Sequence, residues 1–279
     1  MAEQRSQAER WVSFAAGIVT PVTLISALLF YFGYVSARSQ YEYFGIDVDT
    51  IGLSTQDYVM RSPQPLLVPL LVLTLFAVAG VLLHNAIRAR AGLVAVRRAR
   101  LAAILVLAVG VLGLLLYPIL GELAYYALVV PLVIGLAAAA LAYISYLTTT
   151  RQDVRPQVVL IVLLAVVTTT CAFWATATTA QYSGRGLAKS DAEDLDQFPV
   201  VILDTKEKLQ LRSPGLEETA LRPGAGQTFN YRYRGLRLLV VGQNRLFLVP
   251  QKWNASNTTV VVPLDSSIRV QFQFRNDPP

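Results

Sequence analysis

Few side chains in this sequence could carry out acid–base or nucleophilic chemistry. The chain has one histidine, His84, and one cysteine, Cys171. Each lies in or beside an apolar stretch, and the polar region after residue 180 contains neither residue type. A Ser-His-Asp or Cys-His arrangement cannot form there, and a single cysteine makes neither an intramolecular disulfide nor a cysteine-based zinc cluster. We predict no catalytic residues, no cofactor and a protein that is not an enzyme.

Three aspartates in the segment 36–65 are the best candidates for a metal site. Asp47, Asp49 and Asp57 could form a cation site with carboxylate oxygens as ligands. Three carboxylates in an exposed loop are more often solvated. We therefore predict no bound metal, and an oxygen-ligand cation site remains the alternative.

Four arginines are candidates for recognising an acidic group. Arg232 and Arg234 alternate with aromatic residues along one predicted strand, and Arg269 and Arg275 share a face of another. If the two strands are neighbours, these side chains form a basic face that could dock an acidic protein partner or anionic lipid headgroups. The alternative is an ordinary solvated sheet face.

The segment 36–65 is also rich in aromatic residues. Tyr41, Tyr43, Phe44 and Tyr58 suit the headgroup layer of a bilayer, where such rings are half apolar and half hydrated. We predict an ordered element packed on a helical bundle, with Ser54 or Thr55 capping a short helix. These aromatic residues are a second candidate recognition surface.

Five apolar stretches must position all of these residues. They are Trp11–Val35, Pro65–Leu83, Leu101–Leu120, Leu123–Leu147 and Gln157–Ala180. Each comes near or exceeds the roughly 20 residues that cross a hydrocarbon core, and none has a charged residue in its interior. Of the 279 residues, 54% are hydrophobic and only 15% are charged, against about 25% charged in soluble domains. Residues 1–180 are therefore predicted to form a bundle of five transmembrane helices.

The arginines near the ends of these stretches predict the orientation. Nine lie on one side of the membrane, namely Arg5, Arg10, Arg88, Arg90, Arg97, Arg98, Arg100, Arg151 and Arg155. Only Arg38 and Arg61 lie on the other. The excess predicts an N-terminus inside the cytoplasm and a C-terminal region outside it. Because this pattern accounts for much of the net charge of +6, nucleic acid is not an expected partner.

The remaining residues predict a small all-β domain. Residues 181–198 are expected to be a tether and a short helix, with Ser190 and Glu193 forming a capping box. From residue 199 to 279 the apolar pattern has a period of two, with a hairpin turn at Gly242-Gln243-Asn244. Six or seven strands of this kind predict an antiparallel sandwich or a partly open barrel.

These features together predict a multi-pass α-helical membrane protein with a C-terminal β domain. The alanine-, leucine- and arginine-rich composition favours a bacterial protein of the cytoplasmic membrane. We expect a non-enzymatic sensor, adaptor or assembly subunit with a protein partner or self-association. An oligomeric pore or transport-accessory protein is the alternative, with a lumen lined by hydroxyl-bearing helix faces.

Overall fold

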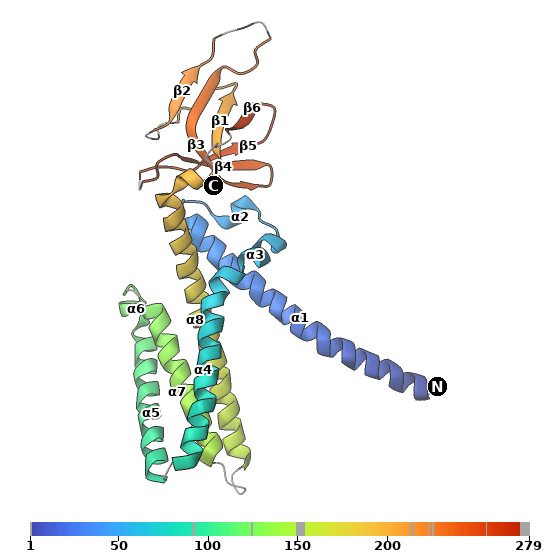
Figure 1. The fold of residues 1–279 in the computed structure, drawn as a ribbon, viewed down its shortest axis with the longest axis vertical. Helices are drawn as coiled ribbons and strands as arrows, with labels where there is room; N and C mark the ends of the chain where they lie inside the picture. The colour runs from blue at the N-terminus through green and yellow to red at the C-terminus, as the bar shows by residue number, and fades with distance from the viewer. Residues whose placement is uncertain are drawn as a thin grey trace. The chain divides into compact units, whose positions relative to one another are not determined.

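The fold comes from a computed structural model, and the chain forms two compact units (Figure 1). The structure describes residues 2–90, 93–123, 125–148, 154–211, 213, 215–222, 224, 226–254 and 256–273. The first unit joins Met1–Pro63 to Gln181–Pro279, and the second is Gln64–Ala180. This division differs from the predicted one, because the first helix and the segment after it, up to Pro63, belong with the β domain.

The second unit consists of helices. They are α4 (Pro63–Arg90), α5 (Leu93–Leu115), the short α6 (Tyr117–Leu120), α7 (Tyr126–Thr148) and the first part of α8 (Val154–Glu193). Helices α5 and α7 pack closely, since a Cβ on Gly110 would lie 2.7 Å from Ile134 Cγ1. The predicted hairpin between the third and fourth apolar stretches is confirmed, with α6 and Gly121 between α5 and α7.

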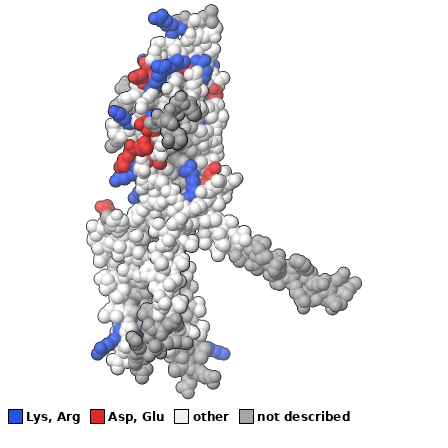
Figure 2. All heavy atoms as spheres, viewed as in Figure 1, with Lys and Arg blue, Asp and Glu red and all other residues white. Residues whose placement is uncertain are grey.

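Among the residues that the structure describes, five helices are long and apolar enough to cross a membrane. The candidate spans are Val22–Glu42, Pro63–Leu82, Val94–Leu115, Tyr126–Thr148 and Arg155–Glu193. Each overlaps one predicted stretch, although the first covers Val22–Glu42 where Trp11–Val35 was predicted. On the face shown in Figure 2, the helices of the second unit present almost no charged side chains between their ends. Large apolar side chains such as Val68, Leu71 and Phe76 are exposed along α4. Such a surface is typical of helices that contact lipid.

The first unit begins with α1 (Ala2–Glu42), followed by α2 (Val48–Ile51) and α3 (Thr55–Arg61). Ser54 caps α3 as predicted, and its hydroxyl accepts a hydrogen bond from the backbone N–H of Asp57. The Asp57 carboxylate accepts one from the Ser54 backbone in return, which completes a capping box. The segment 36–65 is thus ordered, as expected.

This segment packs against the sheet as well as against helix α1. Its buried side chains join Phe247 and Val249 of the sheet and Ala188 and Leu195 near the end of α8 in one apolar cluster. The Thr259 hydroxyl also donates a hydrogen bond of 2.6 Å to the Phe44 carbonyl oxygen. The segment is therefore part of the first unit's core, where it packs against α1 and the sheet.

The predicted tether at 181–189 and the short capped helix after it are wrong. Helix α8 runs without a break to Glu193, so Ser190 lies in its last turn and caps no new helix. Gly184 acts as a packing residue here, because a Cβ at this position would lie 2.1 Å from the Ser36 carbonyl oxygen of α1. Gln40 Nε2 also donates a 2.7 Å hydrogen bond to Asp191. These contacts with α1 keep a glycine-containing segment helical.

Six strands follow the short 3₁₀ helix η1 (Leu195–Gln197). They are β1 (Val200–Thr205), β2 (Glu217–Ala220), β3 (Tyr231–Gly242), β4 (Arg245–Pro250), β5 (Val260–Pro263) and β6 (Ile268–Gln273). They form one antiparallel sheet of order β5-β4-β3-β1-β6, with β2 paired to β3. The predicted hairpin turn is confirmed, since Gln243 and Asn244 both have positive φ between β3 and β4.

The described strands make a single sheet and not the two facing sheets of a sandwich. Its core contains Val201, Leu203, Tyr233, Leu236 and Leu248, all fully buried. The alternation in β6 predicts that Phe272 faces this core. Instead Phe272 is 57% exposed, whereas Ile268 and Val270 of the same strand are half-buried.

Candidate functional site

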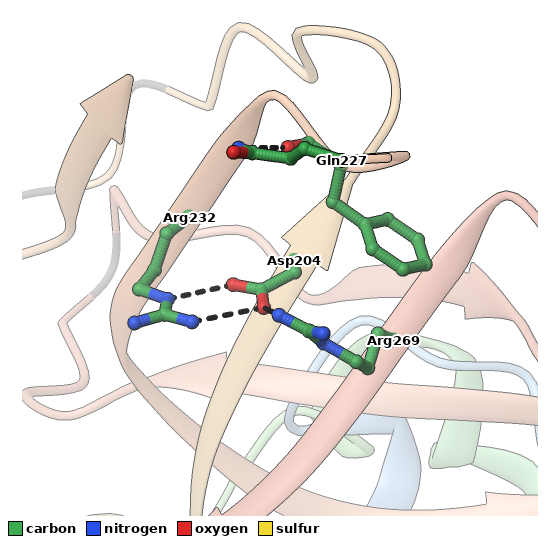
Figure 3. A network of polar contacts seen from close by, with 5 residues as sticks. Asp204, Gln227, Arg232 and Arg269 are labelled. Atoms are coloured by element: carbon green, nitrogen blue, oxygen red, sulfur yellow. Dashed lines mark hydrogen bonds and ion pairs between the residues drawn. The ribbon is translucent and has the colours of Figure 1, made fainter. Parts of the chain in front are cut away.

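A buried carboxylate on the sheet is held by two arginines (Figure 3). Asp204 is on β1, and the strand register places Arg232 of β3 opposite it on one side and Arg269 of β6 on the other. Arg232 Nε and Nη2 donate to the two carboxylate oxygens at 2.8 and 3.0 Å. Arg269 donates to Oδ2 through Nε at 3.0 Å and through Nη2. The Asp204 side chain is fully buried by this arrangement.

The electrostatics of the cluster favour the charged forms. Hydrogen bonds from Arg232, together with those from Arg269, hold the pKa of the Asp204 carboxyl below its usual range, although burial opposes them. The same contact raises the pKa of the Arg232 guanidinium. Two arginines against one carboxylate leave one net positive charge, and the Nη1 donors of both have no acceptor among the described residues.

A hollow of about 440 Å³ opens beside this cluster. Among the residues that line it are Arg222, Gln227, Thr228, Phe229, Arg232 and Arg269. The Arg269 guanidinium carbon lies 5.1 Å from the centre of the Phe229 ring. Gln227 Nε2 donates a hydrogen bond of 2.7 Å to the Phe229 carbonyl oxygen. Arg269 is thus held between an aromatic ring and a carboxylate. Polar donors, an aromatic ring and a net positive charge together suit an anionic group such as a carboxylate or phosphate.

No family model matches the chain, and no curated protein or solved structure does either. The chemistry of its own residues is therefore the basis for assigning a function.

The predicted basic face is only partly assembled. Strands β3 and β6 are not neighbours, because β1 lies between them. Arg232 and Arg269 meet at Asp204, whereas Arg234 is exposed and pairs in register with Glu217 of β2. Arg275 lies outside the described residues. Two of the four arginines therefore serve first to neutralise a buried charge.

The sequence prediction missed Asp204 and Arg222. Asp204 could have been noticed, because it is the one charged residue in the apolar run of β1. A carboxylate on a buried strand requires a cationic partner on an adjacent strand. Arg222 has no such signal, since it lies in the connection between β2 and β3.

The candidate aromatic residues are mostly core residues. Tyr41, Phe44 and Tyr58 are at most 5% exposed, and the Arg61 guanidinium carbon stacks 5.5 Å above the Tyr41 ring. Only Tyr43 of this set is largely accessible, at 41%. The prediction that these rings face headgroups or a partner therefore applies to Tyr43 alone, because the others fill the space between α1, α3 and the sheet.

The three loop aspartates have structural roles. Asp47 caps α2 by accepting from the Asp49 backbone, Asp49 accepts from the Tyr34 hydroxyl, and Asp57 closes the α3 capping box. The Ser54 hydrogen bonds hold the pKa of Asp57 below its usual range. In the part of the chain that the structure describes, no group of three or more His, Cys, Asp or Glu side chains could hold a metal ion.

The two singular residues of the sequence lie in the helical unit. His84 Nδ1 is 2.7 Å from the hydroxyl oxygen of Tyr143, which ties α4 to α7. Cys171 is buried among Val130 and Ile134 of α7 and acts as a small apolar filler.

Proposed function

We propose that this chain is a non-enzymatic integral membrane protein whose β unit recognises an acidic segment of a protein partner. It would serve as a sensor, adaptor or assembly subunit. The observation that carries the proposal is the cationic hollow formed by Arg222, Arg232 and Arg269. Its walls are preorganised, since Asp204 holds two of the three guanidinium groups in place before any partner arrives.

The attachment of the β unit to the helices supports a receptor-like role. Helix α8 contains a candidate span and ends in the β unit, where Ala188 of α8 and the end of α1 share one apolar cluster. A partner bound to the sheet would therefore act on a body that includes the ends of two membrane helices. A flexible tether would not transmit such an event.

Peptide binding to variants that lack single arginines tests the recognition site. Full-length protein in nanodiscs would be titrated with an acidic peptide such as hexa-aspartate, and Arg222→Ala would be compared with Arg234→Ala. Each variant removes one exposed positive charge from the sheet region, but only Arg222 lines the hollow. We expect Arg222→Ala to weaken binding about fivefold, at about 1 kcal/mol per charge, and Arg234→Ala to change it little.

Two outcomes would contradict this assignment. Equal losses in both variants would mean nonspecific attraction to a basic protein. Binding to phosphatidylglycerol vesicles but not to the peptide would make anionic headgroups the ligand. Reversal of Arg232 is not a suitable test, because a glutamate there would face the buried carboxylate of Asp204 and disrupt folding.

The proposed orientation places the β unit outside the cytoplasm. It rests on the nine-to-two distribution of arginines at the ends of the apolar stretches. Ser266 is exposed in the turn before β6, so Ser266→Cys in a Cys171→Ala background offers one accessible thiol. We expect an impermeant maleimide to label this thiol in intact cells. Labelling only after lysis would place the β unit inside.

A pore is less well supported. Thr168, Thr169 and Thr176 of α8 donate their hydroxyl protons to carbonyl oxygens four residues earlier in the same helix. Their donors are thereby satisfied within the helix and not offered to a lumen. Conductance measurements in liposomes test this alternative directly.

A further inference from the structure

A second and larger hollow, of about 910 Å³, lies in the first unit beside the ends of α1 and α8. Its lining includes Glu42, Tyr43, Asp47, Glu193, Trp253 and Asn257. This volume is in the range of small-molecule sites. The hollow is distinct from the arginine-lined one, and it does not share a residue with it.

The charge of the hollow is negative. Three carboxylates line it, and its described lining contains no lysine, arginine or histidine. Glu42 is the last residue of α1 and Glu193 the last of α8, and neither helix has a basic residue in its last turn. A helix carboxyl end already carries partial negative charge, so these positions disfavour glutamate on local grounds. Two such ends meeting at one hollow make it attractive to a cation.

Some of this negative charge is uncompensated by the protein. Glu42 accepts a 2.7 Å hydrogen bond from Arg38, one turn earlier on α1. Neither Asp47 nor Glu193 has an ion-pair partner among the residues that the structure describes. Because the described carboxylates do not cluster as metal ligands do, a bare metal ion is a poor fit.

The aromatic rings point to an organic cation instead. Tyr43 is 41% exposed, and the half-buried Trp253 packs edge-on against Phe44 with ring centres 5.1 Å apart. Aromatic rings beside carboxylates are the usual surroundings of a bound ammonium group, since the ring face attracts the cation while its substituents remain in apolar contact.

Asn257 adds a requirement for an oxygen atom. The residue is only 9% exposed, and its Oδ1 accepts from the Asn254 backbone N–H at 3.1 Å. Its Nδ2 is buried and has no acceptor in the described part of the chain. An unpaired buried amide donor is costly, and an oxygen on a ligand would satisfy it.

We propose that this hollow binds an organic ammonium group with a neighbouring oxygen atom, as in ethanolamine, choline and their phosphate esters. The ammonium group lies against Glu193, Asp47 and the ring of Tyr43, and the oxygen accepts from Asn257. The same chemistry occurs in free solutes and in lipid headgroups.

Calorimetric titration of the full chain in phosphatidylglycerol nanodiscs tests this site without a competing amine lipid. The probes are choline, phosphocholine and 3,3-dimethyl-1-butanol, which has the shape of choline without its charge. We expect choline and phosphocholine to bind, and the neutral alcohol to bind at least about tenfold more weakly because it lacks the attraction to carboxylates and rings. Equal binding of choline and the neutral alcohol would overturn the proposal, as would no binding of any probe.

Matched variants locate the binding in this hollow. Glu193→Gln and Tyr43→Ala should each weaken choline binding about tenfold. Glu218→Gln, which removes a carboxylate elsewhere on the sheet, should leave it unchanged. Glu193 is exposed at a helix carboxyl end, so its loss should not lower thermal stability, and an affinity loss without a stability loss supports the site. Unchanged affinity in Glu193→Gln would refute it.

A change of the nanodisc lipid distinguishes a lipid headgroup from a free solute as the ligand. Nanodiscs that contain phosphatidylethanolamine should suppress choline binding if the headgroup reaches the hollow. Unsuppressed binding would support a free solute as the ligand.

Discussion

Replacing Asp204 with asparagine should destabilise the β unit more than any conservative surface change. The substitution keeps the side-chain volume but removes the charge that both arginines bind. In the native structure the carboxylate accepts hydrogen bonds from Arg232 and Arg269 while being fully buried. An asparagine Nδ2 would present donors to guanidinium donors, and two positive charges on either side of β1 would remain without a counter-ion.

The size of the effect follows from the burial of the partners. Breaking a buried ion pair by removing one member costs about 3–5 kcal/mol. The Arg232 side chain is 25% exposed and that of Arg269 is 49% exposed. Arg269 can therefore turn its guanidinium to water, which screens its contribution. We expect the lower end of the range, about 3 kcal/mol, or about a hundredfold in the opening equilibrium.

Hydrogen–deuterium exchange of the β1 amides measures this opening in the full chain in nanodiscs. Glu218→Gln is the matched control, because it breaks the 2.8 Å ion pair with Lys208, in which both side chains are partly exposed. That surface pair should contribute at most about 1 kcal/mol. If β1 in Asp204→Asn exchanges no faster than in Glu218→Gln, the cluster does not hold the sheet together.

Acid should lower the stability of the β unit through the same carboxylate. The folded-state pKa of Asp204 is lowered, so its contribution to the free energy of unfolding is present above the unfolded pKa of about 3.9. This contribution is lost as the pH falls through the folded-state pKa. Unfolding curves between pH 2 and 6 should therefore fall less steeply in Asp204→Asn than in the wild type. Gly184→Ala should lower the thermal midpoint, since its Cβ would lie 2.1 Å from a carbonyl oxygen of α1. Gly186→Ala should raise the midpoint slightly, because a Cβ there has no atom within 4 Å and alanine favours a helix. Equal shifts would contradict the close packing at Gly184. In denaturant unfolding, Phe44→Ala should lower the free energy of unfolding by about 3–5 kcal/mol and Tyr43→Ala by about 1 kcal/mol or less, because only the Phe44 ring is buried. Similar losses in both variants would show that the segment is not part of the core.

Features that depend on short stretches of sequence could be predicted. Each candidate span is recognisable because a long apolar run has to be shielded from water wherever it lies. The Ser54 capping box and the hairpin turn at Gln243-Asn244 involve residues within three positions of one another, so their chemistry can be read along the chain.

Features that depend on residues far apart in the sequence could not be predicted. Ser190-Asp191-Ala192-Glu193 has the residue types of a helix start, yet α8 continues through it because contacts with α1, some 150 residues away, hold that turn helical. The aromatic residues around Tyr41 and Phe44 have the composition of an interfacial loop, but the sheet buries them.

The sequence by itself determined that this chain has five apolar helices and a β-patterned region, because hydrophobic length and period are local properties of the residues. Only the tertiary structure decided that the first helix joins the β unit, that Asp204 gathers Arg232 and Arg269, and that Glu42 and Glu193 end at one hollow. Those juxtapositions depend on strand order and helix packing, which bring together residues whose separation along the chain says nothing about their distance in space.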